Sequence, residues 1–366
     1  MGWRRWLAEH WLKEEVDERV RAAIKVVDDR YWQRLNDGAT PQRPWYEVRQ
    51  NLERLAEVCR SNPLAARLVS MTTDFVVGAG AKLEAGPWVQ AFWEHPLNRL
   101  DLRLYRWCDE LTRSGELFLV LSRNPVDGMS YVREVPAVLV DEIVTDPDDL
   151  ERELRYHQLT GDVDGRWWPA ANLGPDGPDQ VMVHYTINRP VGQVRGISDL
   201  AAILVWLERY DLWLEDRVRL NRYKGAYLWQ VKVEGALPGQ LEAKRAQYSR
   251  VPTSGSIIVT DGHETWSAVQ PQIAADDAAA DGKALRLMIA AGAGVPLHFL
   301  AEGEGANRAT AREMGTATFR HFAHRQNLFS AMVEDLLVTA ARRAGVEPGP
   351  VKVTFEAVVE RGKDEG

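Results

Sequence analysis

Cysteine is nearly absent from this sequence, and so are the motifs that would point to an enzyme. Cys59 and Cys108 are the only cysteines among 366 residues, which excludes a disulfide framework and favours a reducing compartment. The sequence contains no CxxC, HExxH, GxSxG or GxxxxGKS/T motif, each of which carries a recognisable metal, nucleophile or phosphate chemistry. We therefore predict no catalytic residue, no bound metal and no cofactor, and interpret both cysteines as small buried apolar side chains.

Long apolar runs and a surplus of positive charge are also missing. No stretch reaches the roughly eighteen apolar residues that a membrane-spanning helix needs, and the charges spread through residues 1–16 do not fit a secretory signal. The formal net charge is −8, from 45 Lys and Arg against 53 Asp and Glu. A sequence-specific nucleic-acid binder carries a strongly basic face, so that class is disfavoured. A protein that lets DNA pass without gripping it remains compatible with this charge.

Tryptophan, by contrast, is plentiful, with fourteen residues. Each indole buries a large area and needs a partner for its N–H. Two interpretations stay open: the residues pack in the core, or some of them pack between subunits, where tryptophan is enriched. Hydrophobic residues at 45% and charged residues at 27% are ordinary for a globular protein, and the length allows two or three domains.

The first half of the chain is predicted to form an α+β domain with a mostly antiparallel sheet. Leu52, Leu55, Ala56 and Cys59 have the spacing of one helix face. Further helices are expected from 63 to 77 and from 100 to 113. Asp127-Gly128 is a hairpin signal. Strands are predicted at 116–121, 131–135, near 138–140, at 153–157 and at 181–185.

Three patterns have competing interpretations. Gly78-Ala79-Gly80 is interpreted as a turn, because no strand precedes it as a dinucleotide fingerprint requires. The acidic run 146–149 has the composition of a cation site, but a solvated turn is favoured. His321 and His324 could touch one metal ion, yet no carboxylate lies one turn away from them, so surface histidines are favoured.

In the second half, two helices are predicted to flank a small insert. Ser198 is a suitable N-cap for a helix that reaches Tyr223. The insert, 226–272, is predicted to contain a strand at 227–233, a polar helix at 240–248 and a strand at 256–260, and it is too small to bury a core alone. A helix is then expected from 275 to 291. Charged residues lie towards the far end of the first helix and at the start of the second: Arg217, Arg219, Arg222 and Lys224, and Asp276 and Asp277. The basic group also has an ordinary explanation, because positive charge complements a helix C-terminus.

A glycine-rich acidic loop follows these helices within residues 292–315, GAGVPLHFLAEGEGANRATAREMG. Glu302, Gly303, Glu304 and Gly305 lie between a proline-containing apolar strip and a helix predicted from 308 to 344, for which Asn307 is a candidate cap. A loop of this kind mounted on a long helix is predicted to be a moving part. A strand at 351–356 and a charged tail end the sequence.

Five stretches in this order carry a resemblance to a known family. They are 56–80, 109–121, 142–157, 192–223 and 292–315. On these stretches the chain resembles the portal proteins of tailed double-stranded DNA bacteriophages, over most of residues 45–345. The resemblance implies the portal fold, with these parts: a wing at 1–196, a first stem helix at 197–225, a clip at 226–272, a second stem helix at 273–291, a tunnel loop at 292–307, a long helix at 308–345 and a terminal strand and tail at 346–366. The family's helical crown is expected to be reduced or absent.

The resemblance also implies a function. A ring of subunits, usually twelve, would occupy one capsid vertex of the virion after assembly in the host cytoplasm, and DNA would be packaged and ejected through its channel. The implied partners are the terminase large subunit, the major capsid protein and the head–tail connector, with no membrane involved. Two alternatives stay open: another structural component such as a head–tail adaptor, or an enzyme with an unrecognised site.

The resemblance places the acidic loop in the channel. There, Glu302 and Glu304 would repel DNA phosphates, while Arg308 one turn later would attract them, which favours sliding over gripping. The competing interpretation is a disordered loop whose charges only maintain solubility.

Overall fold

The computed structural model describes residues 43–162, 164–171, 177–225, 228–233, 242–243, 263–269, 278–300, 308–356 and 358. The chain divides into two compact units. One comprises Met1–Gln42 with Val191–Gln193, and the other comprises Arg43–Pro190 with Val194–Gly366. The architecture below belongs to the second unit. No helix in the described ranges is long and apolar enough to cross a membrane.

From residue 43 onwards, four described helices precede the two three-stranded sheets. They are α2 (Trp45–Ser61), α3 (Pro63–Val76), α4 (Pro87–Glu94) and α5 (Leu100–Ser114). The break between α2 and α3 is local in origin: the Asn62 side chain accepts hydrogen bonds from the backbone N–H groups of Leu64 and Ala65, and Pro63 occupies the first helical position, where a missing N–H costs nothing. The apolar stripes of α3 and α5 pack against each other.

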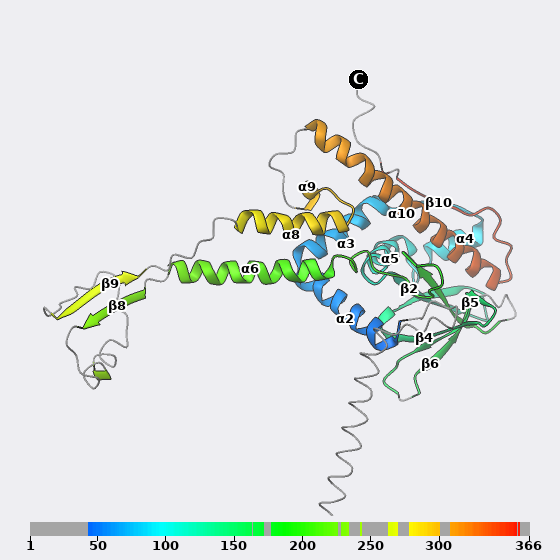
Figure 1. Cartoon of the computed structure of the whole chain (residues 1–366). Helices are drawn as coiled ribbons and strands as arrows, with labels where there is room; N and C mark the ends of the chain where they lie inside the picture. Colours follow the sequence, from blue (N-terminus) through cyan, green and yellow to red (C-terminus); the bar gives the residue numbers. More distant parts are fainter. Residues whose placement is uncertain are drawn as a thin grey trace, which may run out of the picture. The chain divides into compact units, whose positions relative to one another are not determined.

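Two three-stranded antiparallel sheets follow. The first has the order β3-β2-β7, from β2 (Glu116–Arg123), β3 (Ser130–Val135) and β7 (Gln180–Thr186). The second has the order β4-β5-β6, from β4 (Val140–Asp146), β5 (Asp149–Gln158) and β6 (Arg166–Pro169). These strands are drawn in green tones in Figure 1. The prediction of a mostly antiparallel α+β arrangement is confirmed.

Strand β2 separates two hydrophobic cores. Leu117, Leu119 and Leu121 belong to the larger core, and Phe118 and Val120 belong to the smaller one beneath the second sheet. Because successive side chains of a strand point to opposite faces, the unbroken apolar run of β2 indicates burial on both faces.

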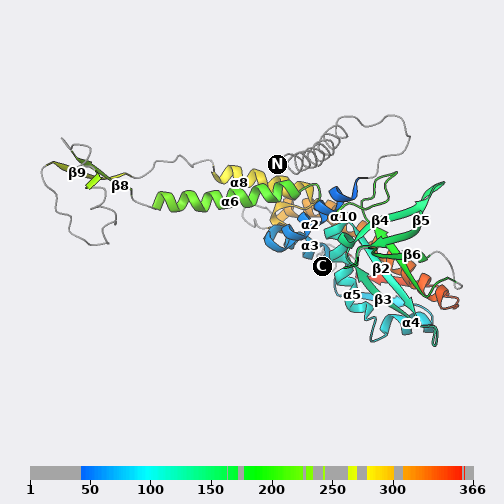
Figure 2. The same ribbon diagram turned by 90° about the horizontal axis from the view of Figure 1, so that it is seen from below.

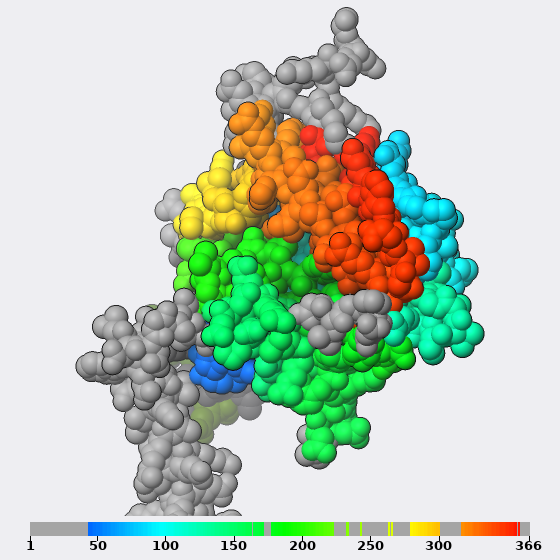
Figure 3. All heavy atoms as spheres, turned by 90° about the vertical axis from the view of Figure 1, so that its right-hand side faces the viewer, coloured from blue at the N-terminus to red at the C-terminus, as the bar shows by residue number. Residues whose placement is uncertain are grey.

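The C-terminal part returns to the first helices. α10 (Arg308–Arg343) packs on α3 and α4, and β10 (Lys352–Phe355) pairs antiparallel with β1 (Ala81–Glu84). Figure 3 shows the orange-to-red end of α10 beside α4, in cyan, on one face. Val333, Leu336 and Leu337 on α10 are completely buried. The predicted turn at 78–80 leads into β1, and neither β1 nor α4 was predicted from the sequence.

Two predicted elements need correction. Residues 137–139 form a 3₁₀ turn, η1 (Ala137–Leu139), instead of a strand, because Pro136 fixes φ at −57° and its carbonyl accepts from the N–H of Leu139. The helix predicted to start after Ser198 begins only at Leu204. Ser198 caps a turn instead, since its Oγ accepts from the N–H of Leu200 at 3.0 Å.

The insert is described in part. β8 (Leu228–Val233) and β9 (Glu264–Val269) form an antiparallel pair, which confirms the first predicted strand. Residues 242–243 are helical. The rest of the predicted polar helix, and the strand predicted at 256–260, lie outside the described residues.

Candidate functional site

The two predicted stem helices lie side by side. α6 (Leu204–Gly225) and α8 (Ala278–Gly292) contact each other, and Figures 1 and 2 show them side by side with opposite chain directions in two orthogonal views. Their approach depends on Gly282, because a Cβ at this position would lie 2.5 Å from the Trp213 ring. Trp213 in turn stacks on Tyr210, with ring centroids 5.8 Å apart. One tryptophan ring and one tyrosine ring therefore pack within the helix pair.

Apolar side chains are nevertheless exposed on two sides of α6. Val205 and Leu212 are 46% and 62% exposed, and Leu214 and Val218 are 40% and 51% exposed. At about 100° per residue, Leu212 and Leu214 lie about 200° apart around the helix. Val205 falls near Leu212 and Val218 near Leu214, so the four side chains form two stripes on opposite flanks. We call these the Leu212 flank and the Leu214 flank.

The charged residues predicted for the stem are only partly described. Arg217 is half-buried, and Arg219 and Arg222 are exposed on α6. Arg219 forms ion pairs with Glu215 at 3.2 Å and Asp216 at 3.7 Å, so part of the basic charge is neutralised by the same helix. Lys224 lies in the last turn of α6, but its side chain is outside the described part, as are Asp276 and Asp277.

The acidic loop itself lies beyond what the structure describes, but both of its attachments are visible. Glu302, Gly303, Glu304, Gly305 and Asn307 fall outside the described residues. The helix turn α9 (Leu297–Leu300) precedes them, and Arg308, described in its backbone only, begins α10. α9 is held by aromatic packing, because Phe299 stacks on Phe75 at 6.2 Å, and Phe75 stacks on Phe322 of α10 at 4.6 Å.

The region where α6 begins and α8 ends is attached to α10. We call residues 196–203 and 291–295 the stem base. Asp199 accepts from Arg325 of α10 at 2.6 Å, and the Thr318 hydroxyl of α10 donates to the Gly294 carbonyl at 3.3 Å. Gly292 packs so closely on Ile203 that a Cβ would overlap its side chain. These contacts join α6, α8 and α10 at one place.

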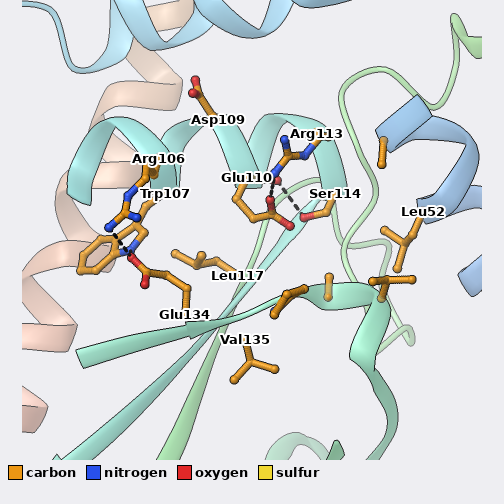
Figure 4. A pocket seen from close by; sticks show the side chains of 14 residues that line it. Leu52, Arg106, Trp107, Asp109, Glu110, Arg113, Ser114, Leu117, Glu134 and Val135 are labelled. Carbon is orange, nitrogen blue, oxygen red and sulfur yellow. Dashed lines mark hydrogen bonds and ion pairs between the residues drawn. The ribbon is translucent and has the colours of Figure 1, made fainter. Parts of the chain in front are cut away.

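A cavity of about 600 Å³ lies between α2, α5, β3 and η1. Figure 4 shows Glu134 meeting Arg106 and Trp107 at one end, and Glu110 meeting Arg113 and Ser114 at the other. Burial alone would raise the pKa of Glu134, but hydrogen bonds from Arg103 and Trp107 hold it below the ordinary value. Glu134 and Glu110 are thus each paired with a guanidinium, from Arg103 and Arg106 and from Arg113.

Neither cysteine has the character of a nucleophile. Cys108 is buried, and burial raises the pKa of its thiol to about 12. Burial also raises the pKa of Cys59. The thiolate is the reactive form. Cys108 lies in the larger core, as predicted, whereas Cys59 is only half-buried against it.

A buried polar cluster was missed by sequence reasoning. The His184 side chain on β7 is fully buried between Glu116 at 3.3 Å and Glu153 at 2.9 Å. Arg195 donates to Glu116 at 2.6 Å, and Tyr156 donates to Glu153 at 2.6 Å. Strand alternation puts His184 on the same face as buried Met182, which is a signal of burial, but the partners come from distant segments.

Groups with metal-ligand composition do not form a metal centre. Across the described residues, no cluster of three or more His, Cys, Asp or Glu side chains is arranged to hold a metal ion. The acidic run at 146–149 forms the turn between β4 and β5, where Asp146 accepts from the N–H of Asp148 and pairs with Arg152 at 3.1 Å. This agrees with the turn interpretation.

Comparisons with solved structures show which proteins share this fold. A chain in the virion of a native gene transfer agent (GTA) particle matches with a TM-score of 0.59 and 16% sequence identity, over 84% of each chain. A chain in the neck of the native GTA particle, computed with C12 symmetry, matches with a TM-score of 0.58 and 16% identity, over 82% of this chain and 83% of that one. An HK97 family phage portal protein from Corynebacterium diphtheriae has a TM-score of 0.42 and 13% identity, over 72% of this chain and 84% of that one.

No protein-family model and no curated protein sequence matches the chain. At identities this low, the matches concern the fold alone. They confirm the mixed helix-and-sheet fold that the resemblance to portal proteins predicts.

Proposed function

We propose that this chain is a portal subunit, which assembles into a ring-shaped channel at one capsid vertex for DNA packaging and ejection. The observation that carries the proposal is the pair of apolar flanks on α6. A helix pair that exposes apolar stripes on opposite sides can bury both of them only against two neighbours. Since the two stripes differ in residues, each contact is heterologous, and repeated heterologous contacts generate a ring when the rotation closes.

Two further observations support the ring. The fold is shared with a chain in the neck of a particle computed with C12 symmetry, which fits a ring of twelve. On α8, Leu287 and Met288 are 47% and 46% exposed. The helix pair therefore exposes apolar side chains on α8 as well as on α6. Exposed apolar side chains on both helices are what a contact between subunits would bury.

The parts of the subunit follow from this proposal. Residues 1–196 form the wing, 197–225 and 273–291 the stem helices, with the first helix proper starting at Leu204, and 226–272 the clip. The clip docks the terminase large subunit and later the head–tail connector, and the wing meets the major capsid protein. The tunnel loop, 292–307, faces the DNA on the channel axis, and the long helix, 308–345, lies behind it.

A complementation experiment on the two flanks tests the ring. Purified wild-type protein is expected to give rings with a central hole in negative-stain electron microscopy. Leu212→Glu and Leu214→Glu should each give monomers, because a buried carboxylate at either flank removes one side of every contact. An equimolar mixture of the two variants should give dimers, since one intact flank remains on each partner.

The controls make the outcome specific to the flanks. Val126→Glu, at a 92% exposed position in the turn between β2 and β3, should leave the rings intact. Each monomeric variant should show a cooperative thermal unfolding transition, as expected of a folded subunit that does not assemble. Monomeric wild-type protein, or rings formed by both flank variants, would contradict the proposal.

A further inference from the structure

Polar contacts hold the stem base on α10: Arg325 donates to Asp199, and Thr318 donates to the Gly294 carbonyl. We propose that Asp199 is a positioning residue, which acts through Arg325 to fix the start of α6 in one orientation on α10, beside the end of α8 that Thr318 holds. The inference concerns how the described helices are held. Its consequence for DNA passage rests on the proposed portal function.

Asp199 connects three segments at one point. Its Oδ1 accepts hydrogen bonds from the Arg325 guanidinium at 2.6 Å and from the Asn188 amide at 2.7 Å. Its backbone N–H donates to the carbonyl of Thr112, at the end of α5, at 3.2 Å. The entrance to α6 is therefore tied at once to α5, to the loop after β7, and to α10.

The ion pair between Asp199 and Arg325 is shielded from water. The side chains are 23% and 10% exposed, whereas the pair between Arg49 and Glu53 within α2 is 54% exposed at both residues. Ion pairs as open as the latter contribute little. Removal of one partner from a shielded pair leaves a poorly hydrated charge, so the Asp199 pair resists separation.

α10 makes a second attachment on the same side. Thr318, which is 3% exposed, donates its hydroxyl to the Gly294 carbonyl just beyond the end of α8. Thr318 and Arg325 are seven residues apart, which is about two turns and roughly 10 Å along one face of a helix. One face of α10 thus contacts the start of α6 and the end of α8, and Gly292 packs on Ile203 between them.

Apolar packing at this junction leaves a gap beside the tight contact of Gly292 with Ile203. A cavity of about 170 Å³ lies among Asp199, Gly292, Gly294, His321 and Phe322. Close packing normally fixes the relative orientation of helices. Where the packing is incomplete, directional polar contacts have to supply that restraint, and the contact between Asp199 and Arg325 is placed to do so.

The position of α10 in the sequence gives this restraint a role. The acidic part of the tunnel loop joins α9 to α10, so a force on the loop acts on α10 directly. Through Arg325 and Thr318, α10 transmits a displacement to both stem helices together. In a portal ring, α10 and the two stem helices would then move as one body.

Hydrogen–deuterium exchange on the full purified chain tests the inference. Asp199→Asn keeps the size of the side chain and an acceptor oxygen but removes the charge. Backbone amides at both stem ends, such as those of Leu207 and Val295, which donate to Ile203 and Ala290, should exchange about fivefold faster or more. Amides of β2 should keep their wild-type rates, which a general loss of stability would not allow.

Two further variants separate positioning from other effects. Arg325→Met alone, and combined with Asp199→Asn, should give the same acceleration, because the effect passes through one pair. Glu53→Gln, which breaks the exposed pair in α2, should change neither stem end. If Asp199→Asn does not fold, Arg325→Lys replaces it, with a smaller acceleration expected at the same amides.

The inference would be overturned if amide exchange became faster to the same extent in β2 and in the stem. It would also be overturned if exchange at the stem ends did not change. Ring formation is scored separately by electron microscopy. Absent rings in the wild type would contradict the proposed portal function, while the exchange result would still decide the role of Asp199.

Discussion

At the scale of single residues, the buried cluster around His184 is the most unusual feature of the described fold. Glu116 and Glu153 flank the imidazole ring, while Arg195 pairs with Glu116 and the charge of Arg189 also acts on Glu153. The two carboxylates beside the ring favour the protonated histidine. Burial alone would lower the pKa of His184, but Glu153 and Glu116 raise it above its ordinary value.

The raised pKa predicts a pH dependence of stability. Because the pKa of His184 is higher in the folded state, its contribution is fully present below about pH 6.5, the value for an unperturbed histidine. It is lost as the pH rises through the folded-state pKa. Urea denaturation of the wild type at a series of pH values should therefore show a falling free energy of unfolding above about pH 6.5.

The matched variants assign this fall to one side chain. His184→Gln should be less stable near neutrality and should lack the fall, whereas His324→Gln, at an exposed position on α10, should retain it. A fall of equal size in His184→Gln would show that other groups cause it. Glu153 has the opposite pH dependence. Burial alone would raise the pKa of Glu153, but His184 holds it below its ordinary value. The contribution of Glu153 to the free energy of unfolding is therefore lost on acidification.

At the scale of elements, a tight crossing of two chain segments fixes where the stem begins. Gly115, in the left-handed region at φ 84°, ends α5, and its carbonyl lies against Gly196 so closely that a Cβ on Gly196 would overlap it. Ile187 also donates its N–H to the Gly115 carbonyl at 2.9 Å. Both sides of this contact are backbone, which cannot turn aside as a long side chain can.

The crossing predicts the effect of one added methyl group. Gly196→Ala should lower the free energy of unfolding by about 1–3 kcal/mol, the usual cost of overpacking, measured by chemical denaturation. Gly161→Ala is the control, because no atom lies within 4 Å of the position its Cβ would take. An unchanged stability in Gly196→Ala would mean that the two segments separate at little cost.

At the scale of the whole molecule, the proposed ring brings the acidic loop into contact with DNA. A ring of twelve would repeat Glu302 and Glu304 around the channel, so the loop's charge acts collectively. Negative charge facing phosphates opposes gripping, while Arg308 repeated in the same ring supplies attraction.

Replacing Glu302 and Glu304 together with Lys should therefore impair DNA packaging or ejection, because the added positive charges hold the duplex. The measurement is DNA content per particle and the yield of released DNA, with ring assembly checked by electron microscopy. The paired change to Gln removes the charge without reversing it and should have a smaller effect. Normal packaging by the Lys variant would contradict a role for the loop's charge.

The sequence by itself determined the features that depend on neighbouring residues. The i, i+3, i+4 spacing in α2, the apolar run of β2 and the Asp127-Gly128 turn each follow from the local backbone geometry. The long helix after Arg308 was predicted for the same reason, because helical periodicity persists along it.

Only the tertiary structure decided what depends on distant segments. Ser198 has the right chemistry for a helix cap, yet its hydroxyl donates to Thr112, and the helix starts six residues later. The partners of His184 and the pairing of β1 with β10 join segments far apart in the sequence, and no periodicity encodes such contacts. The two flanks of α6 became meaningful once α8 was seen to cover the side between them, because exposure is a property of the packed molecule.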